Sequence, residues 1–455
     1  MSKEIAKDLT HGPVLRQLAT FALPVALANA LQAVYSMVDM IVVGQFVGSG
    51  GLSAVGIGGQ LLNMFLSIGM GFSFGAQVLL SQQVGAKDKD LQPTIGTLFT
   101  MEIVASIVFG ILGIVFCGPL LEVMNTPMVA WDEAVDYTVI CCLGMLFIYG
   151  YNAVCGILRG MGESKLPMIF VAIASVVNLV LDLLFVAGFG MGAGGAALAT
   201  VIAQGVSFVT SLVYLVKNKE RFGFDFKLRS FKPSKRHMIP ILKIGIPYIA
   251  QMLLITVSMM YVNAQVNVYG VTASAVDSIG NKLNSVINIV VGAIAVSGAT
   301  MVGQCFGARK LDRVKQCHRA CLAVCMISFV VIAAAYLLLD EQIFGIFSAD
   351  PEVIAMAPSY MRIAVVWVLS MTSMTAPYCI LDGVGNAMLG LVISLLDGVV
   401  GRIGLCIILG KVMGLEGFWL GNALAGFITT IMAGGYYLSG RWKKRDLLLK
   451  QDKTA

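Results

Sequence analysis

The stretch Pro24–Val47, PVALANALQAVYSMVDMIVVGQFV, is long and apolar and carries one charged residue, Asp39. An aspartate costs about 2.5–3.5 kcal/mol at the centre of a membrane helix, and such residues normally face a bundle interior or a water-filled cavity. Asp39 is therefore a candidate for an ion or proton site. The alternative is an aspartate that only caps or pairs within the fold.

The composition of the whole chain agrees with this interpretation. Of its 455 residues, 58% are hydrophobic and 12% are charged, whereas soluble domains carry about 25% charged residues. The net charge of +6 suits an anionic membrane leaflet and requires no nucleic acid. The three histidines lie in polar connecting regions and no CxxC motif occurs, so we expect neither an enzyme nor a bound cofactor.

Twelve apolar runs are long enough to cross a bilayer, which takes about 20 residues. In the first half these runs are 15–46, 52–82, 92–117, 133–158, 167–189 and 193–216. In the second half they are 239–269, 274–304, 317–339, 355–381, 389–410 and 415–439. The pattern predicts an all-α integral membrane protein of about twelve transmembrane helices.

The longest polar interruption, 217–238, divides the chain near its middle. We predict an amino-terminal six-helix bundle over 1–216, a cytoplasmic linker over 217–238, a carboxy-terminal six-helix bundle over 239–440 and a cytoplasmic tail over 441–455. The linker and the tail are basic, whereas the loop 118–132 has no Lys or Arg and the loop 340–354 has four acidic residues and no basic one. Because basic loops remain on the cytoplasmic side, both termini are expected to be cytoplasmic.

The two halves are repeats of each other. Gly85-Ala86-Lys87 and Gly307-Ala308-Arg309 are 222 residues apart, as are Gly58 and Gly280. Six spans per half is an even number, so both halves enter the membrane from the same side. The pseudo-twofold axis is then expected along the membrane normal, and a central cavity between the bundles would open to one side at a time.

Four polar side chains are predicted to lie close to one depth in the amino half. Asp39 and Asp182 each precede the outer end of a span by seven residues, and Thr200 follows the start of the next span by seven. At 1.5 Å per residue, all three lie about 10 Å below the outer surface. Asn178 lies one turn deeper, on the face of Asp182. These groups are hard oxygen ligands for Na⁺ or a proton-accepting pair. The alternatives are an interhelical hydrogen bond and a threonine that bonds backbone.

Other polar groups interrupt the apolar spans of the amino half. Gln32, Tyr35, Tyr137 and Asn152 could line a substrate cavity together with Met37 and Met40, although packing residues give the same pattern. Pro24 is expected to kink the first span and to serve as its hinge. Glu102, in the third span, has no evident partner in the sequence.

Two opposite-charge pairs occur in the carboxy half. Asp277 and Lys282 are five residues apart, and so are Asp397 and Arg402. That spacing is poor for pairing within one α-helix, so we expect partners on other helices and a mainly structural role. The alternative for Lys282 is the release or repulsion of a cationic substrate.

The sequence resembles the multidrug and toxic compound extrusion (MATE) transporters over almost its whole length. The resemblance is carried by Pro24–Gly48, by the Gln82–Lys87 turn QQVGAK, by Tyr151–Pro167, YNAVCGILRGMGESKLP, and by Asn178–Thr200. Asp39 with Asn178, Asp182 and Thr200 looks like the amino-lobe cation site of the DinF-like bacterial branch. The seventh helix has no acidic residue, which argues against the carboxy-lobe site of other branches.

The resemblance implies an antiporter that exports amphiphilic or cationic organic compounds in exchange for Na⁺ or H⁺ by alternating access. It implies no cofactor or metal besides the coupling ion, and small amphiphilic substrates and membrane lipids as partners. Nothing in the sequence demands more than a monomer, and we expect this monomer in the bacterial inner (plasma) membrane. The alternative is a lipid-linked precursor flippase of the wider superfamily, which would favour a strongly cationic cavity, whereas the amino half offers carboxylates.

Overall fold

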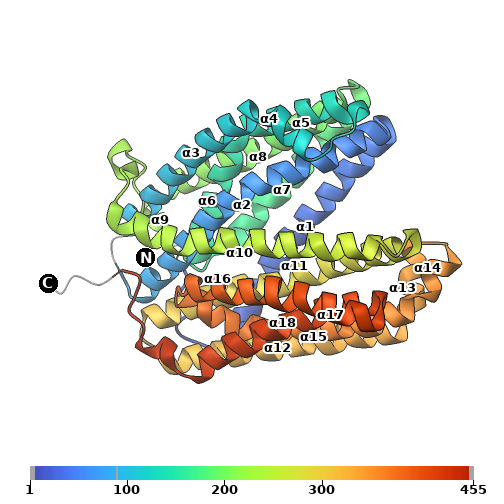
Figure 1. The fold of residues 1–455 in the computed structure, drawn as a ribbon. Coiled ribbons are helices and arrows are strands. Elements are labelled where there is room, and N and C mark those ends of the chain that lie inside the picture. The colour runs from blue at the N-terminus through green and yellow to red at the C-terminus, as the bar shows by residue number, and fades with distance from the viewer. Residues whose placement is uncertain (1–5, 89–90, 450–455) are drawn as a thin grey trace. The chain divides into compact units, whose positions relative to one another are not determined.

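The computed structural model describes residues 6–88 and 91–449, apart from the side chain of Arg221, and this part of the chain contains helices and no strand (Figure 1). Three segments lie outside the described residues: 1–5, 89–90 and 450–455. The first is the start of the predicted amino-terminal bundle, the second lies inside that bundle, and the third is the end of the predicted cytoplasmic tail. Among the described residues, eleven helices are long and apolar enough to cross a membrane, and a bent pair makes a twelfth. This confirms the predicted all-α membrane fold.

The first half of the chain folds mainly into long helices joined by short turns. In chain order it contains α1 (Val14–Phe46), α2 (Ser49–Gly85), α3 (Gln92–Val115), α4 (Cys117–Val123), the 3₁₀ turn η1 (Met128–Ala130), α5 (Trp131–Leu143), α6 (Met145–Gly160), α7 (Lys165–Asp182), the π-helix η2 (Leu183–Gly188), α8 (Gly192–Lys217), α9 (Lys219–Phe222) and the 3₁₀ turn η3 (Leu228–Phe231).

The second half has the same character. It contains α10 (Lys235–Asn267), α11 (Val271–Gly307), α12 (Leu311–Leu338), α13 (Asp340–Phe347), α14 (Pro351–Ala355), α15 (Ala357–Gly383), α16 (Ala387–Leu395), the π-helix η4 (Leu396–Ile403), α17 (Gly404–Met413), α18 (Leu415–Leu438) and the 3₁₀ turn η5 (Arg441–Lys444). Within this half, α15 packs against α11, α12 and α18 (Figure 1).

The described chain divides into two compact units whose boundaries differ from the predicted ones. The amino unit contains residues 6–8 and Leu23–Ile246, and the carboxy unit contains Leu9–Ala22 and the chain from Pro247 onward. Each of α1 and α10 therefore changes unit beside a proline, Pro24 or Pro247.

Specific contacts explain both differences from the predicted boundaries. The linker 217–238 belongs to the amino unit because Gln92 donates to Ser230 Oγ (2.7 Å), and because Gly96 of α3 has no side chain to collide with the Ser230 carbonyl. The Ser230 hydroxyl donates in turn to Asp225, which lowers the pKa of that carboxyl. Leu9–Ala22 belongs to the carboxy unit because Arg313 donates to Gln17 Oε1 (2.6 Å).

The fourth predicted span, 133–158, is broken. The helical segments Met128–Leu143 and Met145–Gly160 bend by 51° at Gly144. A Cβ at Gly144 would lie 2.5 Å from Val201 Cγ1, so only glycine allows α8 to approach the bend this closely.

Backbone geometry confirms the internal repeat. Helices α2 and α11 are both 37 residues long, and each follows a glycine with positive φ, Gly48 (85°) or Gly270 (102°). Lys87 and Arg309 follow these helices and both have φ of 55°, a value that side chains other than glycine rarely adopt. The equal strain at equivalent positions indicates that the two halves use one local structure.

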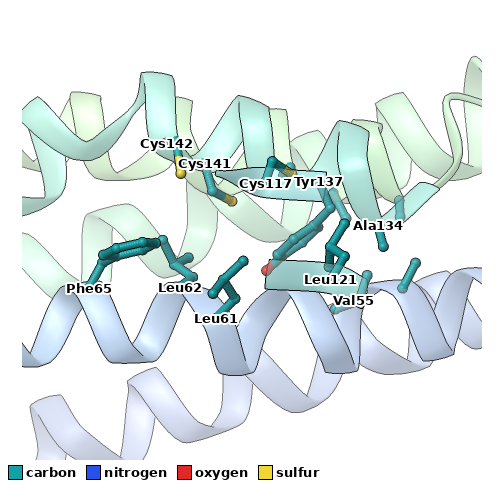
Figure 2. Close-up of a cluster of buried hydrophobic side chains, with 14 of the residues drawn as sticks. Val55, Leu61, Leu62, Phe65, Cys117, Leu121, Ala134, Tyr137, Cys141 and Cys142 are labelled. Atoms are coloured by element: carbon teal, nitrogen blue, oxygen red, sulfur yellow. The ribbon is translucent and has the colours of Figure 1, made fainter. Parts of the chain in front are cut away.

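The core of the amino unit forms between α2 and α5. Figure 2 shows Val55, Leu61 and Phe65 of α2 facing Tyr137 and Cys141 of α5, and all five are buried. Gly58 lies under the ring of Tyr137, because a Cβ there would be 2.7 Å from Tyr137 Cδ1. In the carboxy unit, Gly280 makes room for Tyr360 in the same way. Each tyrosine is thereby held at the wall of a pocket.

Candidate functional site

Helix α1 carries a stripe of polar residues on one face. Asn29, Gln32, Ser36 and Asp39 are spaced by three or four residues, which places them on one side of an α-helix. All four line a cavity of about 430 Å³ that lies within the amino unit. The lining of α1 extends from Val25 to Met40, which is about 22 Å along a helix axis.

Small and polar residues of the neighbouring helices form the other walls. Gly56 and Gly59 of α2 leave open space, since a Cβ at either position would have no neighbour within 4 Å. Gln60 and Asn63 continue the same face of α2. The remaining polar lining comes from α5, α6, α8 and the turn before α7, and comprises Tyr137, Tyr151, Asn152, Arg159, Ser164, Thr200 and Gln204.

The cavity is mostly neutral. Asp39 and Arg159 are the only acidic or basic side chains in its lining. A volume of this size falls within the range of about 300–1,000 Å³ typical of small-molecule pockets. The amino unit therefore offers space for an organic molecule beside a buried carboxylate.

Of the six residues named as candidates for a cavity lining, five lie in the wall of this cavity, namely Gln32, Tyr35, Met40, Tyr137 and Asn152. Met37 does not, because its side chain is 62% exposed and contributes nothing to the wall. Two residues turn an α-helix by about 200°, so Met37 lies on the opposite face of α1 from Asp39. Met40 lines the cavity, and Pro24 lies inside α1 next to the lining residue Val25.

The four predicted ion ligands come from α1, α7 and α8. Asp39 and Thr200 line the cavity, whereas Asn178 and Asp182 lie behind its wall on α7. The Asn178 amide donates to Thr200 Oγ1 (3.4 Å), and the charge of Asp39 acts on Asp182. The structure thus brings Asn178 of α7 together with Thr200 of α8.

Several buried oxygens at this place lack partners. Asp39, Asn178 and Asp182 are 7%, 2% and 0% exposed. In the described part of the chain, Asp39 Oδ1, Asn178 Oδ1 and both carboxylate oxygens of Asp182 accept no hydrogen bond. A buried unpaired carboxylate is very costly unless it is protonated or bound to a cation. The arrangement can therefore accept a proton or a metal cation.

Irregular backbone at the end of α7 and at the start of α8 positions Asp182 and Thr200. Asp182 ends α7, and the π-helix η2 follows at once; single π-turns often occur at functional sites. Glu133 accepts a hydrogen bond from the Ala193 N–H at the start of α8. Gly192, with φ of 61°, leaves room for that carboxylate, so the first turn of α8 is fixed and Thr200 is held beside α7.

Sequence reasoning missed part of the cavity lining. Asn29 and Gln204 line the wall, and each had a usable signal: Asn29 precedes Gln32 by three residues and Gln204 follows Thr200 by four. Arg159 also lines the cavity from the last turn of α6, and it is the one basic residue of the lining.

The charged pairs of the carboxy half depart from prediction. Arg402 contacts Asp397 Oδ1 (3.3 Å) within one helical segment, because η4 is a π-helix and brings residues five apart together. Asp277 accepts from Asn281 Nδ2 (3.0 Å), and no ion pair joins it to the exposed Lys282 in the described residues. In the amino half, Glu102 gains a partner, since Ser73 of α2 donates to its Oε1 (2.6 Å).

These features define a polytopic membrane transporter: two repeated helical units, and a polar cavity with a buried carboxylate in one of them. The MatE family profile matches residues 24–184 and 247–408, corresponding segments of the two repeats, and the chain belongs to this family of multidrug efflux transporters. Members of the family are transporters and not enzymes.

Similar proteins match almost the whole length of the chain. The probable multidrug resistance protein YpnP of Bacillus subtilis (strain 168) is 30% identical over 451 residues, which cover 98% of this chain and all of that protein. The probable multidrug resistance protein YoeA of the same organism is 28% identical and covers 95% of each chain. A crystal structure of MATE in complex with MaD3S aligns with a TM-score of 0.89 at 21% identity, over 98% of this chain and 100% of that one.

Proposed function

We propose that this protein is a cation-coupled antiporter that exports amphiphilic or cationic organic compounds in exchange for Na⁺ or H⁺. The observation that carries the proposal is the set of buried, unpartnered oxygens of Asp39, Asn178 and Asp182 at the wall of a drug-sized cavity. Two carboxylates that interact with each other cannot both remain charged and unpaired in such a place. One shared proton, or one Na⁺ held by carboxylate, amide and hydroxyl oxygens, would neutralise them.

The position of Asp39 supports exchange. Because Asp39 itself lines the cavity, an organic cation there is attracted by its carboxylate. An ion that neutralises Asp39 removes that attraction and favours release of the organic cation. The effect is reciprocal, so bound substrate lowers the affinity for the ion by the same factor.

Helix α1 can convert ion binding at Asp39 into a movement of the cavity wall. It leaves the carboxy unit and enters the amino unit between Ala22 and Leu23, next to Pro24. Pro24 cannot donate the intrahelical hydrogen bond of its turn, which allows a bend at this point. Neutralisation of Asp39 would shift the outer part of α1 about Pro24 and alter the cavity wall.

The flippase alternative is less well supported. A carrier of anionic lipid-linked precursors would favour a cavity with several basic groups, whereas Arg159 is the one basic residue in this lining and Asp39 offsets it. The cavity suits neutral or cationic amphiphiles better.

A gradient experiment tests the function. Purified protein in liposomes is given an imposed Na⁺ or pH gradient together with a fluorescent organic cation. We expect the dye to move against its own gradient under at least one ion gradient, and to stop when the gradient is dissipated by an ionophore. Dye movement that ignores both gradients, or ion flux without dye exchange, would refute antiport.

We propose that the protein is a monomer in the bacterial inner membrane and that both of its termini lie in the cytoplasm. We expect membrane lipids and amphiphilic substrates as its partners, and no nucleic acid. The support is the basic linker and tail and the acidic loop 340–354.

Cysteine labelling tests this topology. All ten native cysteines are buried, so the background with an impermeant maleimide should be low. Lys227→Cys, in the linker, is expected to react only from the cytoplasm, because basic loops are retained there. Ile346→Cys, at a site 80% exposed in the acidic loop, is expected to react on intact cells. Labelling of Lys227→Cys on intact cells would invert the orientation.

A further inference from the structure

Arg159 is the one basic residue in the lining of the cavity in the amino unit. Its Nε is buried and has no hydrogen-bond partner in the described part of the chain. None of the ion pairs among the described residues involves its guanidinium. We infer that Arg159 is a substrate-recognition residue that binds a carboxylate, so that the cavity selects zwitterionic amphiphiles. This inference takes the cavity to be the substrate site of the proposed function.

The acidic side chain nearest to Arg159 along the chain is already paired. Glu163 follows Arg159 by about one helical turn, but its carboxylate contacts Lys7 Nζ (2.6 Å) and accepts a hydrogen bond from the Lys165 N–H (2.7 Å). The other arginines in buried surroundings do have partners: Arg402 contacts Asp397, and Arg313 donates to Gln17. A guanidinium that lines a cavity without such a partner is left available for an anionic ligand.

Asp39, the one acidic residue of the lining, lies toward the other end of the cavity. It precedes Gly48, in the turn between α1 and α2, by nine residues, which is about 14 Å of helix. Gly156 lies one turn before Arg159 and packs on α2, since a Cβ there would be 2.7 Å from the Ser73 carbonyl. Ser73 is 25 residues beyond Gly48, or about 38 Å. The two charges are therefore roughly 20 Å apart along the helices and do not neutralise each other.

The local structure of α6 directs Arg159 into the cavity. Asn152, Cys155 and Arg159 follow at intervals of three and four residues, so they share one face of the helix, and all three line the cavity. Helical side chains tilt toward the N-terminus of their helix, so the guanidinium extends back along this face. Its planar fork presents two parallel N–H donors that match a carboxylate, and the Asn152 amide offers another donor farther along.

The internal repeat shows that the backbone here does not require an arginine. The segment LRGMG, which contains Arg159, and the segment LDGVG, which contains Asp382, are 223 residues apart. Both end in a glycine of positive φ, Gly162 (80°) or Gly385 (72°). In both, the glycine after the charged residue packs on a main-chain carbonyl, which would lie 2.8 or 2.7 Å from a Cβ at that glycine. The two turns form alike with opposite charges, so the cation at this position serves the cavity and not the turn.

Equilibrium binding of two dyes to purified protein tests the inference. Rhodamine B carries a carboxylate, and its ethyl ester has the same cationic chromophore without that negative charge. The ratio of the two affinities, compared between variants, removes the apolar binding that the dyes share. We expect Arg159→Gln to weaken binding of the acid at least tenfold relative to the ester, because a neutral amide forms no charge-assisted pair with a carboxylate. Arg159→Lys should retain only part of the preference, because an ammonium lacks the planar fork.

Arg319→Gln is the matched control, because Arg319 is an exposed arginine of α12. Its acid-to-ester ratio should equal that of the wild type. Retained binding of the ester shows that Arg159→Gln is folded. If that variant does not fold, competition in the wild type gives the answer: decanoate should displace rhodamine B at a concentration at least tenfold lower than its neutral isostere decanamide.

An acid-to-ester ratio that is the same in the wild type and in Arg159→Gln, or decanoate that competes no better than decanamide, would overturn the inference. The outcome is distinct from that of the antiport experiment, because no ion gradient is imposed. A ratio that depends on Arg159 in a protein that moves no dye under either gradient would refute antiport and leave carboxylate recognition standing.

Discussion

Replacing Asp39 by asparagine is expected to abolish gradient-driven efflux and to leave the protein folded. Asparagine keeps the shape of the side chain and removes its charge. It also removes a carboxylate that is 7% exposed and has an unpartnered oxygen, so stability should not fall. The coupling free energies of linked sites are typically about 1–3 kcal/mol, or 5–150-fold in affinity, and this coupling should be lost. Dye uptake into liposomes under each ion gradient measures the effect.

The control for this experiment is Asp312→Asn, which makes the same chemical change at an exposed position of α12. Its uptake should match that of the wild type. Asp182→Asn should resemble Asp39→Asn, since Asp182 is fully buried and neither of its carboxylate oxygens has a partner among the described residues. Wild-type efflux in Asp39→Asn would remove this carboxylate from the mechanism.

Replacing Arg402 by methionine is expected to cause the largest loss of stability. Arg402 and Asp397 are 7% and 8% exposed, and Thr429 donates a further hydrogen bond to Asp397 Oδ2 (2.7 Å). Removing one partner of a buried ion pair typically costs about 3–5 kcal/mol, because the other charge remains buried alone. Thermal unfolding of purified protein in detergent should show a clear decrease in midpoint.

The double variant Asp397→Asn/Arg402→Met distinguishes two causes of the stability loss. One is the unpaired charge left on Asp397, and the other is the loss of the packing contacts of the Arg402 side chain. Since it leaves no buried charge, it should recover most of the stability that Arg402→Met alone removes. If the two single losses simply add in the double variant, the ion pair is not what stabilises η4.

The spans and the repeat could be predicted because they depend on local composition. A bilayer demands about 20 apolar residues per helix, and 15–46 and 415–439 correspond closely to α1 and α18. The break at Gly144 could not be predicted, since the close approach of Val201 that requires a glycine there is a contact with a later helix. The Asp397–Arg402 contact escaped prediction for a similar reason: packing, not sequence spacing, determines where a π-helix forms.

The candidate site could be predicted in part. Depth along the spans placed Asp39, Asp182 and Thr200 at one level, and the structure brings Asn178 within hydrogen-bond distance of Thr200. Met37 could have been excluded from the cavity on sequence alone, because it is two residues from Asp39 and therefore lies on the opposite face of the helix.

Binding of a fluorescent organic cation to purified protein, measured across a Na⁺ titration and a pH series, tests whether ion and substrate exchange at Asp39. If Asp39 is where ion and substrate exchange, the wild-type protein will release the dye as Na⁺ or H⁺ rises. The Asp39→Asn protein will then hold its dye with an affinity that neither ion changes. Ion-dependent release that persists unchanged in Asp39→Asn would exclude Asp39 as the coupling site and place that site elsewhere in the chain.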